Sequence, residues 1–312
     1  MHLPIEEKPP PPATTSHELT DIAGVAGISV LRDGDFLNLG FVQQHQQQML
    51  VFLESDRYLA ALQRNQHVSA VLTRPELVAL VPGALGVGVC SQPRLAFAAV
   101  HNRLASTGFY WQEFPSVIAP DARVHPTAWV APINVRIGPR SVVEPHATIL
   151  ERCLVGEDVV VGAGAVLGGV GFQTARTEEA MVEMKHAGGL IVGDRVLVLP
   201  GAVIATGLFR CATEIANDVR IGSQAFVSHG VKVAERSFVG HGAVVNGNVV
   251  IGAGVWIGPG AVIANDLEIG PEAFVSLGAV VISDLPAGSR VSGNFAVPHT
   301  GLLRKLAATE FA

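Results

Sequence analysis

Two histidines are the clearest candidates for proton transfer: His229 in the segment AFVSHGVKV and His241 in VGHGAVV. An imidazole titrates near neutral pH, so either residue could serve as a general base that deprotonates an amine or hydroxyl nucleophile. Backbone N–H groups close to such a base would be enough to stabilise an oxyanion. Whether the two histidines share one site depends on the elements that position them.

The positioning element is a repeat of six residues. Starting at Ile215, every sixth residue is Ile or Val, twelve times in succession, and the last is Val281. Blocks with the same period occupy residues 118–167, with one single-residue slip, and 192–204. A period of six is neither the 3.6 of a helix nor the alternation of a hairpin strand. It predicts a β-solenoid in which each step is one short strand and one corner, with the aliphatic residue pointing inwards.

This repeat predicts where the two histidines lie. Each follows an inward aliphatic position by two residues, so each is expected at or near an outer corner of the solenoid. Because His241 comes two steps after His229, we expect it on a different face. Residues 168–190 and 205–214 interrupt the period, and loops on a rigid scaffold commonly carry binding groups. We expect residues 168–190 to loop out.

The composition fits a narrow solenoid and excludes several classes of protein. The 312 residues are 49% hydrophobic but only 6% aromatic and 15% charged, which excludes a disordered chain. A net charge of −6 argues against nucleic-acid binding. No apolar run is long enough to cross a membrane, and the N-terminus lacks the apolar core of a secretory signal. Three cysteines without a CxxC pair indicate a reducing, cytoplasmic setting. Low charge and positive hydropathy predict an oligomer.

The chain divides into four parts by pattern. Residues 1–18 form a Pro-rich tail that we expect to be disordered, and residues 19–115 a small α/β domain with a helix at 56–65 and strands at 49–53, 69–72 and 86–90. Residues 116–298 form the solenoid domain with its loop at 168–190. Residues 299–312 form a short C-terminal helical segment. The fold class is therefore mainly β, with a small N-terminal α/β domain.

The hexad motif [LIV]-G-x-x-[AVS]-x is similar to the hexapeptide repeat of left-handed parallel β-helix acyltransferases. In that family three hexads make one triangular coil of 18 residues, which implies a left-handed parallel β-helix of about eight coils. Further segments resemble, in order, those of the UDP-3-O-(3-hydroxyacyl)glucosamine N-acyltransferase family of lipid A synthesis. They are LVFLESDRYLAAL (50–62), QPRLAFAAVHNRL (92–104), HPTAWVAP (125–132), GGVGF (168–172) followed by MKHAGG, and SHGV (228–231).

The resemblance implies a set of binding and catalytic residues. In the family a Phe and a Tyr six residues apart sandwich the uracil, which assigns nucleotide binding to Phe52 and Tyr58. Ser55 stands where the family has Asn in this nucleotide-binding segment. The SHGV histidine, His229, falls at the position of the catalytic base. Gly247 falls where the family places a backbone oxyanion donor.

Two more residues are candidates for supporting the base or binding the acceptor. Asp266 stands where the family has a second histidine, and His241 is a further candidate close to the repeat that carries His229.

The resemblance also implies substrates and partners. The activity would be transfer of an acyl group from a phosphopantetheine thioester on acyl carrier protein to the amine of a UDP-linked amino sugar. The enzyme would be a cytoplasmic homotrimer with no metal and no permanently bound cofactor. Three alternatives remain open: an N-acetyltransferase that uses acetyl-coenzyme A on a nucleotide-linked amino sugar for surface polysaccharide, a γ-type carbonic anhydrase, and a non-catalytic sugar-nucleotide-binding scaffold.

Overall fold

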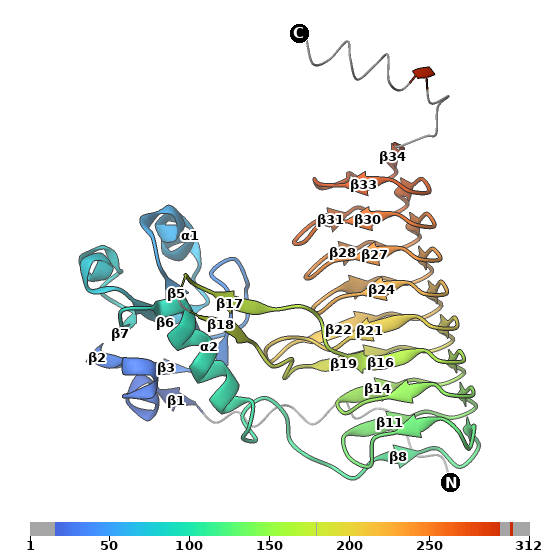
Figure 1. Ribbon diagram of the computed structural model, residues 1–312, viewed down its shortest axis with the longest axis horizontal. Helices are drawn as coiled ribbons and strands as arrows, with labels where there is room; N and C mark the ends of the chain where they lie inside the picture. The colour runs from blue at the N-terminus through green and yellow to red at the C-terminus, as the bar shows by residue number, and fades with distance from the viewer. Residues whose placement is uncertain (1–15, 179, 294–299, 302–312) are drawn as a thin grey trace.

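The fold is a triangular prism of stacked coils with a smaller α/β domain beside it (Figure 1). A computed structural model of the chain describes residues 16–178, 180–293 and 300–301. Most of the Pro-rich tail and of the C-terminal segment predicted from the sequence therefore lies outside the described residues.

The prism is a left-handed β-helix whose three faces are parallel sheets. Each face is named here after its first strand. The β8 face consists of β8 (Val117–Ile118), β11 (Val135–Ile137), β14 (Cys153–Val155), β19 (Gly189–Val192), β22 (Ala212–Ile215), β25 (Lys232–Val233), β28 (Val250–Ile251) and β31 (Glu268–Ile269). The β9 face consists of β9 (Arg123–Val124), β12 (Val142–Val143), β15 (Val160–Val161), β20 (Leu197–Val198), β23 (Arg220–Ile221), β26 (Phe238–Val239), β29 (Trp256–Ile257), β32 (Phe274–Val275) and β34 (Arg290–Val291). The β10 face consists of β10 (Trp129–Val130), β13 (Thr148–Ile149), β16 (Val166–Gly169), β21 (Val203–Ala205), β24 (Phe226–Val227), β27 (Val244–Val245), β30 (Val262–Ile263) and β33 (Val280–Val281).

The prism interior is filled by the residues that the repeat predicted. All twelve hexad aliphatics that start at Ile215 and end at Val281 are at most 5% exposed. The buried cluster that runs through the prism contains Ala, Val, Ile, Leu and Cys side chains and no aromatic ring. A coil of three short strands encloses too little space for large rings, which explains the low aromatic content of the chain.

The corners of the prism use left-handed backbone at regular intervals. Gly230, Asn248 and Asp266 have φ values of +69°, +60° and +59°, and they follow one another at the 18-residue spacing of a coil. Glycine adopts this conformation freely, and Asn and Asp tolerate it better than other residues do. Residues one position earlier, at 229, 247 and 265, are therefore stacked along the same corner.

The α/β domain is built on a five-stranded sheet with the order β2-β7-β6-β5-β4, in which β4 to β7 are parallel and β2 is antiparallel. Its elements are β1 (His17–Glu18), β2 (Ser29–Arg32), β3 (Asp35–Phe36), β4 (Asn38–Leu39), β5 (Met49–Leu53), α1 (Leu59–Arg64), β6 (Val68–Thr73), β7 (Gly86–Val89) and α2 (Pro93–Leu104), with 3₁₀ turns at Leu19–Ile22, Val25–Gly27, Asp56–Tyr58 and Pro75–Leu80. The predicted helix at 56–65 is a 3₁₀ turn that continues into α1. Among the described residues no helix is both long and apolar enough to cross a membrane.

The predicted insertion at 168–190 leaves the prism as an antiparallel hairpin of β17 (Thr174–Arg176) and β18 (Met181–Glu183). The hairpin extends towards α2, between the prism and the α/β domain (Figure 1). Ala175, Met184 and Ala187 of the insertion share one buried cluster with Phe97 of α2 and with Phe209 of the prism. The insertion therefore ties the two domains together through a common apolar core.

Candidate functional site

The corner between β24 and β25 brings together the base and the oxyanion donor predicted from the sequence. His229 and Gly247 are 18 residues apart, so Gly247 lies one coil above His229 at the same corner. The backbone of one coil is bonded to the next here, since the N–H of Asn248 donates to the carbonyl of His229 at 2.9 Å. A rigid ladder thus sets the position of the imidazole relative to Gly247.

The two ring nitrogens of His229 have different surroundings. Nδ1 lies 3.2 Å from the hydroxyl oxygen of Ser228. The Nε2 edge lies against the Cα of Gly247, because a Cβ built on that glycine would be only 2.6 Å from Nε2. If Nδ1 carries the proton and donates to Ser228, the lone pair of Nε2 is left for proton abstraction. This arrangement has the chemistry of a general base.

Burial sets the protonation of His229. The residue is 7% exposed, and burial lowers the pKa of its imidazole because the cation is poorly solvated there. The negative charge of Asp266 acts in the opposite direction and raises the pKa of His229. The imidazole is therefore neutral at pH 7, the state that a base requires.

The N–H of Gly247, which the resemblance predicts to be an oxyanion donor, already has a partner. It donates to the side-chain oxygen of Asn265, the next residue in the same stack, at 3.0 Å. The hydrogen bond between this N–H and the exposed amide of Asn265 would have to break before the N–H could donate to an incoming oxyanion. Asn265 was not among the site residues predicted from the sequence, although its 18-residue spacing from Gly247 would have placed it at this corner.

A second histidine, His186, packs against His229 and was also missed. The centroids of the two rings are 5.2 Å apart, with an interplanar angle of 71°. His186 belongs to the MKHAGG segment of the insertion, 43 residues earlier in the chain. The sequence predicted that the insertion would loop out, but the structure shows that its last part returns over the corner and packs against His229.

His241 and Asp266 take different places around this corner. His241 lies at the corner between β26 and β27, away from His229 as predicted, and its Nδ1 accepts from the N–H of Ser223 at 3.0 Å. Asp266 is exposed two coils above His229, and its carboxylate accepts from the side-chain amide of Asn248 at 3.0 Å. Of the two, only Asp266 acts on His229, through its charge.

The nucleotide-binding residues predicted from the resemblance lie at the carboxyl end of β5. Phe52 packs on the α2 side of the sheet, whereas Tyr58 packs with the cluster on the α1 side. A guanidinium lies over each ring, Arg94 over Phe52 at 5.5 Å and Arg57 over Tyr58 at 5.3 Å from the ring centroid. Ser55 caps the following 3₁₀ turn, accepting from the N–H of Arg57 at 3.2 Å.

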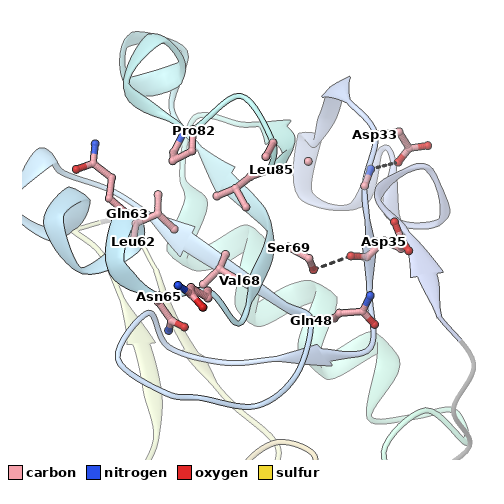
Figure 2. Close-up of a pocket in the computed structure, with 14 residues that line it drawn as sticks. Asp33, Asp35, Gln48, Leu62, Gln63, Asn65, Val68, Ser69, Pro82 and Leu85 are labelled. Atoms are coloured by element: carbon pink, nitrogen blue, oxygen red, sulfur yellow. Dashed lines mark hydrogen bonds between the residues drawn. The ribbon is translucent and has the colours of Figure 1, made fainter.

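A hollow of about 530 Å³ lies at the opposite edge of the same sheet. Figure 2 shows Asp33 and Asp35 on one side of it and Gln63 and Asn65 on the other. Neither Phe52 nor Tyr58 lines this hollow. Two carboxylates disfavour the diphosphate of a nucleotide, so this hollow is a poor place for UDP.

The described residues contain no group of three or more His, Cys, Asp or Glu side chains arranged to hold a metal ion. His186 and His229 approach each other, but no third such ligand joins them within the part of the chain that the structure describes.

Comparison with known proteins gives matches to hexapeptide-repeat transferases. The family profile "Bacterial transferase hexapeptide (six repeats)" matches residues 134–169. A UDP-3-O-acylglucosamine N-acyltransferase of Pseudomonas fluorescens is 26% identical over 253 residues, which cover 71% of this chain and 70% of that protein. One of Azorhizobium caulinodans is 27% identical over 257 residues, with 71% of each chain covered. Among solved structures, one match is LpxA of Bacteroides fragilis, a UDP-N-acetylglucosamine acyltransferase. The two chains are 19% identical with a TM-score of 0.44, and the match covers 61% of this chain and 78% of the LpxA chain.

Proposed function

We propose that this chain, a hexapeptide-repeat acyltransferase related to the UDP-3-O-acylglucosamine N-acyltransferases, transfers an acyl group to the amine of a UDP-linked amino sugar in lipid A synthesis. The family resemblance predicted from the residues is confirmed by these matches. The finer proposal is that the donor is an acyl thioester on the phosphopantetheine arm of acyl carrier protein and that His229 is the general base.

The reaction follows from the groups at the β24–β25 corner. The sugar amine attacks the thioester carbonyl, and Nε2 of His229 takes the proton that the amine loses as the new C–N bond forms. The N–H of Gly247, released by Asn265, donates to the oxyanion of the tetrahedral intermediate. The C–S bond then breaks, and the proton held by His229 passes to the departing thiolate.

The observation that carries this proposal is the contact between Nε2 of His229 and the Cα of Gly247 at a buried corner. The decisive assay offers the purified protein UDP-linked amino sugars with hydroxyacyl carrier protein and, separately, with acetyl-coenzyme A, and follows the release of free thiol. We expect thiol release with the carrier protein. A preference for acetyl-coenzyme A would favour the N-acetyltransferase alternative. Consumption of neither donor would contradict the acyltransferase proposal.

Phe52 and Tyr58 are proposed to hold the uracil at the carboxyl ends of the parallel strands, the edge at which α/β sheets bind ligands. The guanidinium groups of Arg94 and Arg57 beside these rings suit the diphosphate. We expect Phe52→Ala and Tyr58→Ala each to raise the Kd for UDP roughly tenfold or more, because a base loses its stacking partner. Calorimetric titration measures this change. Phe238→Ala, at an exposed ring on the prism, is the control, and an unchanged Kd in folded variants of Phe52 and Tyr58 would refute the sandwich.

The proposed homotrimer needs an apolar surface, and the β10 face supplies one. The outward-pointing strand residues of the β10 face include no charged side chain. On each of the other two faces, charged side chains interrupt the outward row. The outward residues of the β10 face are Trp129, Thr148, Val166, Val203, Phe226, Val244, Val262 and Val280. An apolar strip of this length on an otherwise rigid prism is typical of a subunit contact.

Two substitutions in one coil test this contact. We expect Val244→Glu, on the β10 face, to convert trimers to monomers, because a carboxylate in an apolar contact is left unpaired. Val250→Glu, at an outward position of the neighbouring β8 face, is the matched control and keeps the trimer. Sedimentation velocity distinguishes the two states. A Val244→Glu protein that sediments like the wild type would exclude this face as the contact.

A further inference from the structure

His186, near the end of the insertion, is held tightly between Gly171, near the start of the insertion, and His229. It is 6% exposed, and its Nε2 accepts from the backbone N–H of Gly171 at 3.1 Å. A Cβ built on Gly171 would lie 3.0 Å from Nε2 of His186 and 3.0 Å from Nδ1 of His229. Both ends of the insertion, at Gly171 and at His186, therefore close over the Nδ1 side of His229, so tightly that an added methyl group on residue 171 would have to displace the rings.

The bonds of His186 suit a neutral ring. Since Nε2 accepts from the N–H of Gly171, the proton of the neutral ring is on Nδ1. Burial lowers the pKa of His186 to about 4, and the nearby groups His229, His101 and Arg152 act in the same direction within that shift. His186 therefore stays neutral wherever His229 can act as a base, and it does not compete for the substrate's proton.

Helix α2 anchors the segment that carries His186, between β18 and β19. The ring of His101 is fully buried, with Nδ1 2.7 Å from the hydroxyl of Tyr110 and Nε2 2.6 Å from the carbonyl of Lys185. Asn102 accepts from the N–H of Lys185 at 2.9 Å and donates to the carbonyl of Glu183 at 2.8 Å. The position of His186 is thus determined by the α/β domain as well as by the prism.

We propose that His186 is a positioning residue for His229: together with Gly171 it covers the Nδ1 side of the base, excludes water from it, and leaves Nε2 as the reactive edge over Gly247. The proposal rests on the proposed role of His229. It assigns the family insertion a specific task, which is to bring a neutral histidine from a segment fixed by α2 onto the catalytic corner.

The test is the titration of His229 by NMR in protein labelled at histidine, which needs no turnover. The groups that face the two rings are Asp266, His101 and Arg152, and none of them is altered. Because burial depresses the pKa of His229, we expect His186→Ala to admit water and raise that pKa towards its usual value. The acid limb of kcat/KM should move to higher pH with it, and kcat should fall roughly tenfold to a hundredfold while KM stays within about threefold.

Two further variants keep the test decisive. His186→Gln retains an acceptor for the N–H of Gly171 and is expected to restore most of kcat and the low pKa of His229. Gly171→Ala keeps both histidines but displaces them from each other. We expect it to raise the pKa of His229, as His186→Ala does. It therefore tests the proposal even if His186→Ala does not fold. His125→Ala, at an exposed histidine of the prism, is the control. An unchanged pKa of His229 in the folded variants would overturn the proposal, whether or not the acyltransferase assay succeeds.

Discussion

Replacing His229 with alanine is expected to lower kcat by about 10²- to 10⁴-fold, the usual contribution of a positioned general base. The ring of His229 is the group that approaches Gly247 with a lone pair. His186 packs against it, but the Nε2 of His186 already accepts from the N–H of Gly171. Steady-state kinetics with the preferred donor and acceptor measures the loss. His229→Gln, which keeps more of the side-chain volume, separates lost chemistry from lost packing.

The pH profile gives an independent reading of the same prediction. Burial lowers the pKa of His229, so the neutral, active form persists below the usual value of 6.5, and kcat/KM is lost only as the pH falls through the lowered pKa. Asp266→Asn removes the charge that raises this pKa and is expected to move the acid limb to still lower pH. Wild-type turnover in His229→Ala, or an acid limb above pH 6.5 in the wild type, would contradict the assignment.

Gly247→Ala is expected to cost about 100-fold in kcat without unfolding the prism. The added Cβ would lie 2.6 Å from Nε2 and 2.9 Å from Cε1 of His229, so the ring must move, and displacement of a catalytic group by about 1 Å has a cost of this size. Folding should persist, since the backbone N–H of residue 247 and its bond to Asn265 are retained. Gly83→Ala, which adds a methyl group into open space, is the control.

A second substitution, at Asn265, separates steric displacement of His229 from the role of the Gly247 N–H as oxyanion donor. Alanine keeps the N–H, so the effect of Gly247→Ala reports on the position of His229. Asn265→Ala removes the competing acceptor instead. Since a hydrogen bond typically contributes about 1 kcal/mol, kcat should rise by roughly fivefold if this N–H binds the oxyanion. A fall in kcat for Asn265→Ala, with the fold intact, would place the oxyanion elsewhere.

The prism could be predicted in detail because its pattern is local. The six-residue count predicts which residues point inwards. Val227 and Ile257 are two of them, and both side chains are buried as predicted. The strand at β5 and the helix that includes α1 were also predicted from short-range patterns of apolar residues. The positions of His229 and His241 at different corners follow from the same arithmetic.

The surroundings of the candidate site could not be predicted in this way. Ser228 was part of the quoted SHGV motif, but its bond to Nδ1 depends on the rotamer of His229. His186 reaches the site only because the hairpin packs on α2, through contacts between residues about 80 positions apart. The place of Phe52 and Tyr58 in two different clusters likewise depends on how the sheet is covered.

The six-residue period is visible in the amino-acid sequence alone, and the prism, the inward residues and the 18-residue stack that aligns His229 with Gly247 follow from it. In a solenoid each residue contacts its neighbours one coil away, so a position in the chain translates directly into a position in space. Tertiary packing, in contrast, buries His229, brings His186 over it and bonds the N–H of Gly247 to Asn265. The position of His186 over His229 comes from the insertion that interrupts the repeat, because an insertion takes its path from the surfaces it packs against.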